Sequence, residues 1–130
     1  MFDKQVYIDR RAELKKNVKS GLILFPGNDE AAMNYSGNTY SFRQDSSFLY
    51  YFGLDIPGMF GVIDIDENKE ILFGHEYTLE DIVWMGPQPK LGQLAELIGV
   101  ANYESIDKLK KFIKSKQSKQ VKIHFLPTYR

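Results

Sequence analysis

The stretch Phe42-Arg43-Gln44-Asp45-Ser46-Ser47-Phe48-Leu49-Tyr50-Tyr51-Phe52-Gly53 decides how the rest of the chain is interpreted. Its polar first half runs into five apolar or aromatic residues, which a glycine closes. Aromatic side chains suit a pleated, packed surface, so we predict a strand over residues 48–52. Because aromatic residues fall on both of its faces, we expect this strand to lie in the interior of a sheet.

The polar half of the stretch should lie at the N-terminal end of this strand. Arg43 and Asp45 are separated by a single residue, and charged side chains are rarely buried without a partner. We therefore expect the two side chains to form a structural ion pair or to fix a loop.

On either side of the stretch, the chain predicts helices that alternate with short strands. Apolar residues at helical spacing, cap residues, and glycine or proline stops define these elements. The expected helices cover residues 4–18, 91–98 and 106–116, with one helical turn at 29–33 and a short helix from 78 to about 85. The expected strands cover residues 21–25, 48–52, 60–65, 70–73 and 121–125, and residues 34–40 are expected to form a loop.

Capping and turn residues give the most specific of these predictions. Asp3 and Ser105 can cap the helices that follow them, and Gly99 can end the helix before it. Residues 66–69 have the length of a hairpin connection, so the strands around them and the strand at 48–52 should form an antiparallel meander. The alternation of helices and strands predicts one layered α/β domain over residues 1–130. The chain stops abruptly at Arg130, and we expect a further segment to follow it.

Composition excludes several classes of protein. Lysine plus arginine and aspartate plus glutamate each number 17, so no net field would attract nucleic acid or an anionic membrane. Cysteine is absent, which excludes disulfides, thiolate zinc sites and a cysteine nucleophile. No apolar run approaches the length of a signal sequence core or a membrane span. We expect a cytoplasmic protein that binds neither nucleic acid nor membrane.

Candidate metal ligands are few and badly spaced. His75 and His124 stand far apart in the sequence, and each is better explained as a histidine at the end of a strand with a local hydrogen bond. Residues 64–68 begin like a calcium loop, but Lys69 and His75 occupy the positions that need glycine and glutamate. We therefore interpret these acidic residues as an exposed hairpin tip and assign no catalytic or metal-binding residue.

Seven lysines lie along the last predicted helix and just after its C-terminal end. They lie at positions 108, 110, 111, 114, 116, 119 and 122. A basic stripe can contact phosphate, but arginine and exposed aromatic residues are missing from this one. The solvated face of an amphipathic helix is the better interpretation.

Trp84 has two interpretations. It can pack the short helix as a core residue, or it can lie exposed beside a Pro/Gly-rich loop and contact a ligand or partner. The residue types alone leave both possibilities open.

Several motifs together resemble a known family. The stretch FRQDSSFLYYFG is followed by Ile56-Pro57-Gly58, Gly61-Val62-Ile63-Asp64 and Ile82-Val83-Trp84-Met85-Gly86. In this order they resemble the amino-terminal domain of the proline-specific metallopeptidases, the Xaa-Pro aminopeptidases (aminopeptidase P) and Xaa-Pro dipeptidases (prolidase). The resemblance extends from Arg10 to about Ile123 and implies a creatinase-like amino-terminal domain, a mixed sheet with flanking helices.

The resemblance also implies a function for the parent protein. It would hydrolyse peptide bonds next to proline, with two divalent ions, commonly manganese, held in a carboxyl-terminal pita-bread domain that this chain lacks. The chain itself would be non-catalytic and bind no metal. It would support a homodimer or higher homo-oligomer, and Trp84 would line the substrate pocket of the partner subunit, with Arg43 and Asp45 shaping the loop around it.

A second function from another class fits the same resemblance. Some relatives of this fold have lost catalysis and bind proteins or peptides, among them a histone-chaperone subunit. The parent of this chain would then be a binding protein and not an enzyme. The five metal ligands of the catalytic domain, two Asp, one His and two Glu, would distinguish the two possibilities.

Overall fold

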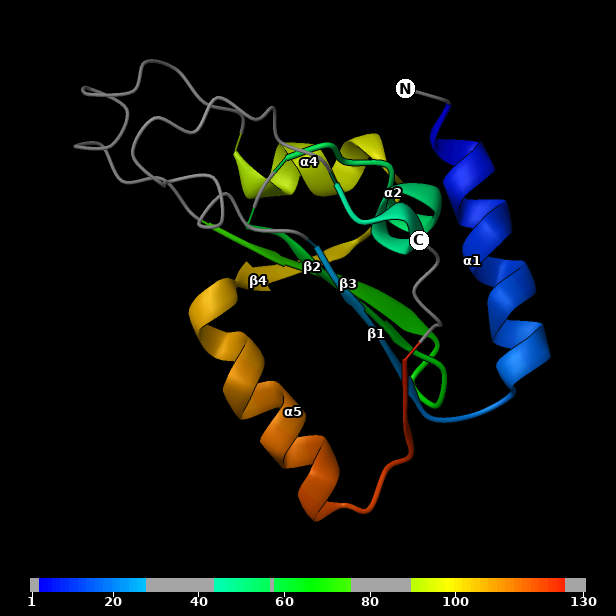
Figure 1. Ribbon diagram of the computed structural model, residues 1–130, viewed down its shortest axis with the longest axis vertical. Helices are drawn as coiled ribbons and strands as arrows, with labels where there is room; N and C mark the ends of the chain where they lie inside the picture. The colour runs from blue at the N-terminus through cyan, green and yellow to red at the C-terminus, as the bar shows by residue number, and fades with distance from the viewer. Residues whose placement is uncertain (1–2, 28–43, 57, 76–89, 126–130) are drawn as a thin grey trace, which may run out of the picture.

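The structure is a computed structural model that describes residues 3–27, 44–56, 58–75 and 90–125. Helices and strands alternate along these residues, as the sequence predicts (Figure 1). The elements are α1 (Lys4–Val18), β1 (Leu22–Pro26), α2 (Ser46–Phe52), β2 (Phe60–Asp64), β3 (Lys69–Gly74), α4 (Leu91–Leu97), β4 (Asn102–Ser105), the 3₁₀ helix η2 (Ile106–Lys108), α5 (Leu109–Ser118) and β5 (Ile123–Phe125).

The strands of the described residues form one mixed sheet in the order β4-β3-β2-β1-β5. β1 pairs with β2, and β2 with β3, in antiparallel register. The edge strand β5 pairs with β1, and the edge strand β4 with β3, in parallel. Helices α1, α2 and α4 cover one face of the sheet, and α5 covers the other (Figure 1). The layered α/β fold with a mixed sheet and flanking helices is therefore confirmed.

Strand β1 divides its side chains between the two faces. Ile23 and Phe25 point toward α1, α2 and α4, while Leu22 and Leu24 point toward α5. All four are buried, because β1 has a neighbour on both sides and a helical layer above and below. Burial of each such side chain stabilises the folded state by about 1.5–3 kcal/mol. With four of them, β1 is the centre of the core.

The predicted strand at residues 48–52 is wrong, because these residues form helix α2. The Asp45 carboxylate accepts a hydrogen bond from Phe48 N at 3.0 Å, which caps the first turn. Gly53 ends the helix in the left-handed conformation, with φ 71°, where a side chain would be strained and would collide with the Tyr7 ring. Phe48 and Phe52 lie one turn apart and are fully buried, so the aromatic run follows a helical period.

The meander therefore has a different third strand from the one predicted. The hairpin of β2 and β3 is confirmed, and Asn68 adopts φ 52° in its turn. Its antiparallel neighbour is β1 and not the stretch at 48–52. Strand β4 was not predicted, because its sequence Asn-Tyr-Glu-Ser is polar and its side chains are largely exposed.

The remaining helices match the sequence more closely. Asp3 caps α1 and Gly99 follows α4 with φ 73°, both as predicted. Ser105 accepts a hydrogen bond from Asp107 N, but the helix it caps starts as η2 and continues as α5 to Ser118. The helical turn at 29–33, the loop at 34–40 and the short helix from 78 lie outside the described residues.

Candidate functional site

Two of the predicted site residues, Trp84 and Arg43, lie outside the described residues. The predicted ion pair between Arg43 and Asp45 is therefore not tested. Asp45 itself is a helix cap for α2, a local structural role different from the predicted ion pair or loop. The described residues next to them in the sequence include Gly27, Gln44 and His75.

These bordering residues meet at one end of the sheet. Gly27 N donates a hydrogen bond to Met59 O at 3.0 Å, which joins the end of β1 to the start of β2. A Cβ atom on Gly58 would lie 3.2 Å from the His75 ring, and one on Gly74 would lie 2.9 Å from Met59 Sδ. We call this region, Gly27, Gln44, Gly58, Met59 and residues 74–75, the sheet end.

Gln44 organises the sheet end from within. Its side chain is buried, and its Nε2 donates to the carbonyl oxygens of Leu54 and Ile56, both at 3.0 Å. Its Oε1 accepts from Asp45 N at 3.1 Å. A buried amide with donors and acceptor engaged fixes the residues before and after α2 relative to each other. In the sequence, Gln44 stands out only as part of a polar cluster.

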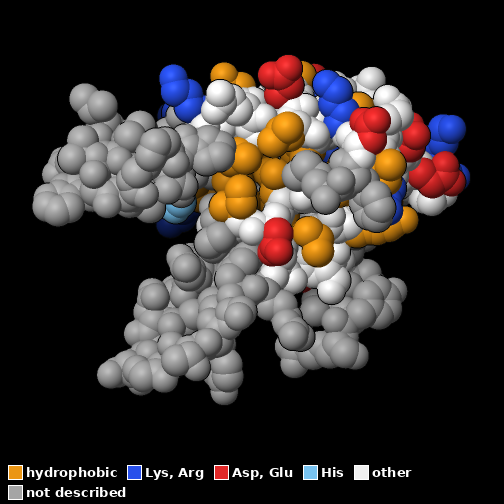
Figure 2. Space-filling model, turned by 90° about the horizontal axis from the view of Figure 1, so that it is seen from above, with side chains coloured by type: hydrophobic (Ala, Val, Ile, Leu, Met, Phe, Trp, Pro, Cys, Tyr) orange, Lys and Arg blue, Asp and Glu red, His pale blue; other side chains and the backbone are white. Residues whose placement is uncertain are grey.

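The side of the domain above α4 and α2 presents apolar side chains to solvent. Seen from above, Figure 2 shows hydrophobic side chains gathered near the middle of this side. Leu97 of α4 is 53% exposed, and Leu49 and Tyr50 of α2 are 41% and 46% exposed. Where such side chains form a contiguous patch, they are typical of surfaces that contact another protein or domain, so these three are candidates for a contact of this kind.

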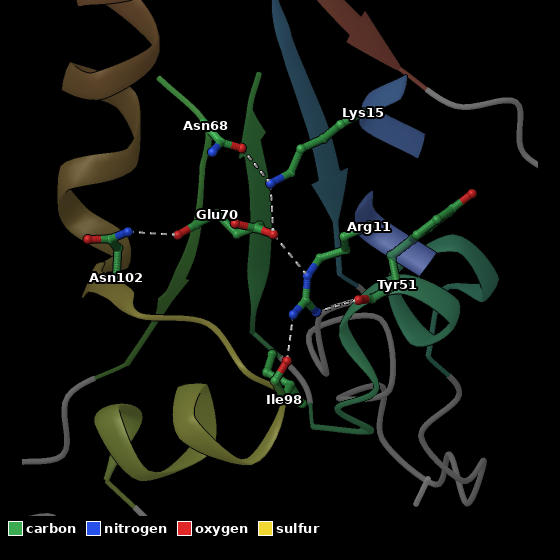
Figure 3. A network of polar contacts seen from close by, with 7 residues as sticks. All are labelled: Arg11, Lys15, Tyr51, Asn68, Glu70, Ile98 and Asn102. Atoms are coloured by element: carbon green, nitrogen blue, oxygen red, sulfur yellow. Dashed lines mark hydrogen bonds and ion pairs between the residues drawn. The ribbon is translucent and has the colours of Figure 1, made fainter. Parts of the chain in front are cut away.

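Beneath the helices, a buried arginine joins the α1, α2 and α4 layer to the sheet (Figure 3). Arg11 Nη1 donates to Tyr51 O at 2.8 Å, and Nη2 donates to Ile98 O at 2.6 Å. Its Nε lies 3.5 Å from Glu70 Oε1, and the same oxygen lies 3.2 Å from Lys15 Nζ. The guanidinium therefore connects four elements, α1, the end of α2, the end of α4 and β3.

Two side chains in or beside this network, Arg11 and Tyr51, have shifted pKa values. Burial lowers the pKa of Arg11 from its usual value, and the Glu70 carboxylate opposes that shift. Burial also raises the pKa of Tyr51, with a further rise from Tyr50 and an opposing effect of Arg10. Because the Arg11 guanidinium contacts helix carbonyls and one carboxylate, the network is a structural joint and not an acid–base pair.

The histidines match their predicted roles only in part. His124 is the middle residue of β5, and its Nε2 lies 3.1 Å from Ser20 O, a contact with a residue 104 positions earlier and not the local hydrogen bond expected. His75 lies at the sheet end, beside Gly58. Within the part of the chain that the structure describes, no three His, Cys, Asp or Glu side chains are grouped closely enough to share a metal ion. Two divalent ions therefore do not fit the described residues.

The acidic hairpin tip is only partly as predicted. Asp64 is fully buried, with Oδ2 2.7 Å from Lys116 Nζ and Oδ1 accepting from Glu67 N at 3.2 Å. Lys116, assigned to a solvated stripe, is only 13% exposed. No local sequence pattern indicates this pair, because its two members stand 52 residues apart and meet only when α5 packs on the sheet.

Comparison with known proteins gives the family. The family described as aminopeptidase P, N-terminal domain, matches residues 7–124. The chain belongs to this family. It is 31% identical over 107 residues to the Xaa-Pro dipeptidase of Homo sapiens, a match that covers 80% of this chain and 22% of that protein.

Solved structures confirm the fold. Aminopeptidase P from E. coli superposes with a TM-score of 0.70 at 21% identity, covering 88% of this chain and 27% of that one. A protein of Bacillus anthracis assigned as an aminopeptidase P superposes with a TM-score of 0.82 at 15% identity, covering 99% and 32%. The chain thus spans about a fifth to a third of the length of these three proteins. None of its described helices is both long and apolar enough to cross a membrane.

Proposed function

We propose that this chain is the non-catalytic N-terminal domain of an Xaa-Pro aminopeptidase or Xaa-Pro dipeptidase. In this proposal it supports homodimerisation and contributes Trp84 to the substrate pocket of the neighbouring subunit. The observation that carries the proposal is the sheet end, where the residues bordering the Arg43 and Trp84 segments meet. The exposed apolar side chains of α2 and α4 support a contact surface on the same domain.

The chemistry would be supplied outside this chain. Two divalent ions, with manganese as our expectation, would activate water and polarise the scissile carbonyl of a proline-containing peptide in the cytoplasm. The described residues hold no group of ligands for these ions. Its part would be to position the substrate and to limit access to the site.

Trp84 gives the sharpest test of this proposal. In the full-length parent, Trp84→Ala should lower kcat/KM for an Xaa-Pro dipeptide or an Xaa-Pro-Pro peptide about 10- to 100-fold, since a lost aromatic contact is a lost positioning contact. Thermal unfolding should change little. Trp84→Phe should retain most of the activity, because a phenyl ring still fills part of the pocket. Equal losses of stability and rate in Trp84→Ala would favour core packing instead.

Mixed dimers would show which subunit uses the tryptophan. One subunit carries Trp84→Ala, and the other carries an intact Trp84 and a disabled metal site. If Trp84 acts on the partner subunit, each mixed dimer holds one complete site and has about half of the wild-type rate. If Trp84 acts within its own subunit, mixing restores nothing and the proposed role across the dimer is wrong.

The metal ligands of the parent decide between enzyme and binding module. The coding sequence downstream of Arg130 should encode two Asp, one His and two Glu in that order. This chain by itself should not hydrolyse Gly-Pro or Xaa-Pro-Pro substrates, with or without manganese. A parent without these ligands would contradict the peptidase function and favour a protein- or peptide-binding module.

A further inference from the structure

An open groove lies on the α5 side of the sheet, between α5 and the strands β3 and β4. Its volume is about 650 Å³. The apolar side chains Ile71 and Phe73 of the sheet and Phe112 of α5 lie along its floor. It lies on the opposite face of the sheet from α1, α2 and α4, so it is separate from the apolar surface above those helices (Figure 1).

The rim of this groove is positively charged. Lys69, Lys108 and Lys111 line it, against one carboxylate, that of Glu104. Glu104 and Lys108 form an exposed ion pair at 3.4 Å, which leaves two further ammonium groups on the rim. The groove therefore offers an excess of positive charge in a protein whose net charge is zero.

Strand β4 forms one wall of the groove and is also an edge of the sheet. Among the described residues, β4 pairs with β3 on one side and with no strand on the other. Its Tyr103 side chain is 49% exposed. An edge strand presents unpaired backbone donors and acceptors, which an extended peptide can use as a template.

We propose that the groove binds an extended, acidic peptide segment of a partner protein, which adds to β4 as a further strand. In a strand, alternate side chains face one side and repeat about every 6.6 Å. One carboxylate can reach Lys111, and the next can share Lys108 with Glu104. These two lysines are three positions apart on η2 and α5, about 4.5 Å along a helix axis. The other side chains of the segment would face away from α5.

Charge argues against two other occupants. A second copy of this chain pairing edge to edge would bring the same lysine-rich rims together and repel. Nucleic acid would need a larger basic surface with arginine for phosphate contacts, and the rim has no arginine. A strand that carries carboxylates can pair with the backbone of β4 and also place negative charges beside the lysines.

Binding can be tested with a blocked eight-residue peptide in which glutamate alternates with valine. Its affinity for the 130-residue chain is measured by fluorescence anisotropy, and the contact site by amide NMR shifts. We expect shifts centred on β4 and α5, affinity that falls as salt rises, and binding at least fivefold weaker when glutamine replaces glutamate. An oligothymidylate of similar length and sedimentation of the chain alone report on the other occupants.

Matched charge reversals on one helix locate the site. Lys108→Glu with Lys111→Glu should weaken binding at least tenfold, because each reversal replaces attraction by repulsion. Lys110→Glu with Lys114→Glu, exposed residues of α5 that do not line the groove, should leave affinity within about twofold, because direct contact sets the affinity.

Several outcomes would overturn the proposal. These are no binding at about 1 mM peptide, equal affinity for the glutamine peptide, or shifts centred away from β4. Equal weakening by both pairs of reversals would show a general charge effect. Tighter binding of the oligothymidylate, or a dimer that the groove reversals alter, would assign the groove to another occupant. The two peptides decide the matter even where a variant fails to fold.

Discussion

The two faces of the sheet each bury an ion pair, and the pairs are built differently. On the α1, α2 and α4 face, Arg11 meets Glu70 and two backbone carbonyls. On the α5 face, Asp64 meets Lys116 and one backbone amide. Both Arg11 and Asp64 are fully buried, so each needs its partners to offset the cost of leaving water.

The difference follows from the shape of the two cations. A guanidinium presents a planar fork of donors, and Arg11 uses it to reach the C-terminal ends of two helices at once. A cation at a helix C-terminus also interacts favourably with the helix dipole. An ammonium is a point charge on a flexible chain, and Lys116 reaches Asp64 while it stays partly exposed. Arginine thus connects several elements where lysine fixes one helix.

Removing the arginine should therefore cause the largest loss of stability. Arg11→Met keeps the bulk of the side chain but leaves the carbonyls of Tyr51 and Ile98 without their donor and Glu70 with Lys15 alone. We expect a loss of about 3–5 kcal/mol in the free energy of unfolding, measured by urea denaturation.

The neighbouring arginine provides the matched control. Arg10 is on the same helix, donates to Tyr50 O at 3.0 Å and stacks over the Tyr50 ring at 3.9 Å, but it lies nearer to solvent. Arg10→Met should cost about 0.5–1 kcal/mol. Equal losses for the two variants would show that burial of the guanidinium does not set its importance.

Breaking the Asp64–Lys116 pair should lower the free energy of unfolding less than Arg11→Met does. The two single variants should differ, because Asp64 is fully buried and Lys116 is partly exposed. Lys116→Met leaves the buried Asp64 carboxylate without a cation, so we expect a loss of about 2–3 kcal/mol. Asp64→Asn leaves Lys116 able to reach water and should cost about 1 kcal/mol. The double variant should be more stable than Lys116→Met alone, since no unpaired charge is left. A reversed order of the single variants would contradict this account.

The parts of the fold that the sequence predicted rest on local signals. Asp3, Ser105 and Gly99 act within one helical turn, and the hairpin needs only its turn and two apolar runs. These contacts join residues close in sequence, so a pattern read along the chain contains them. The motifs that indicate the family are likewise short runs of neighbouring residues.

The errors lie where distant contacts or short elements decide. Helix α2 spans only two turns, too few for its period to stand out against the strand preference of its aromatic residues. Its caps, Asp45 and Gly53, were present as signals but were assigned to a loop and a strand end. Strand β4 and the Asp64–Lys116 pair depend on partners far along the chain, which no local pattern shows. For the site, Trp84 and Arg43 stay predictions, and Gln44 became visible only through its buried hydrogen bonds.

The cap of α2 tests how much the α1, α2 and α4 face depends on local structure. Asp45→Ala removes the acceptor for Phe48 N and should cost about 1 kcal/mol, less than either buried pair. Asp45→Asn keeps an acceptor and should cost little. Both are measured by urea denaturation, with far-ultraviolet circular dichroism to follow helix content. A loss comparable to that of Arg11→Met would show that Asp45 does more than cap the helix.

The smallest effect should appear at high pH on the same face. The pKa of Tyr51 is raised in the folded chain above its usual value of 10.0, chiefly by burial, so the folded state holds this proton more tightly than the unfolded state. The resulting stabilisation is complete below about pH 10 and is lost as the pH rises through the folded pKa. In Tyr51→Phe, the free energy of unfolding should therefore fall less steeply with pH above about 10 than in the wild type. Parallel pH profiles for the two proteins would show that Tyr51 does not couple ionisation to folding, and a steeper decline in the variant would reverse the sign of the argument.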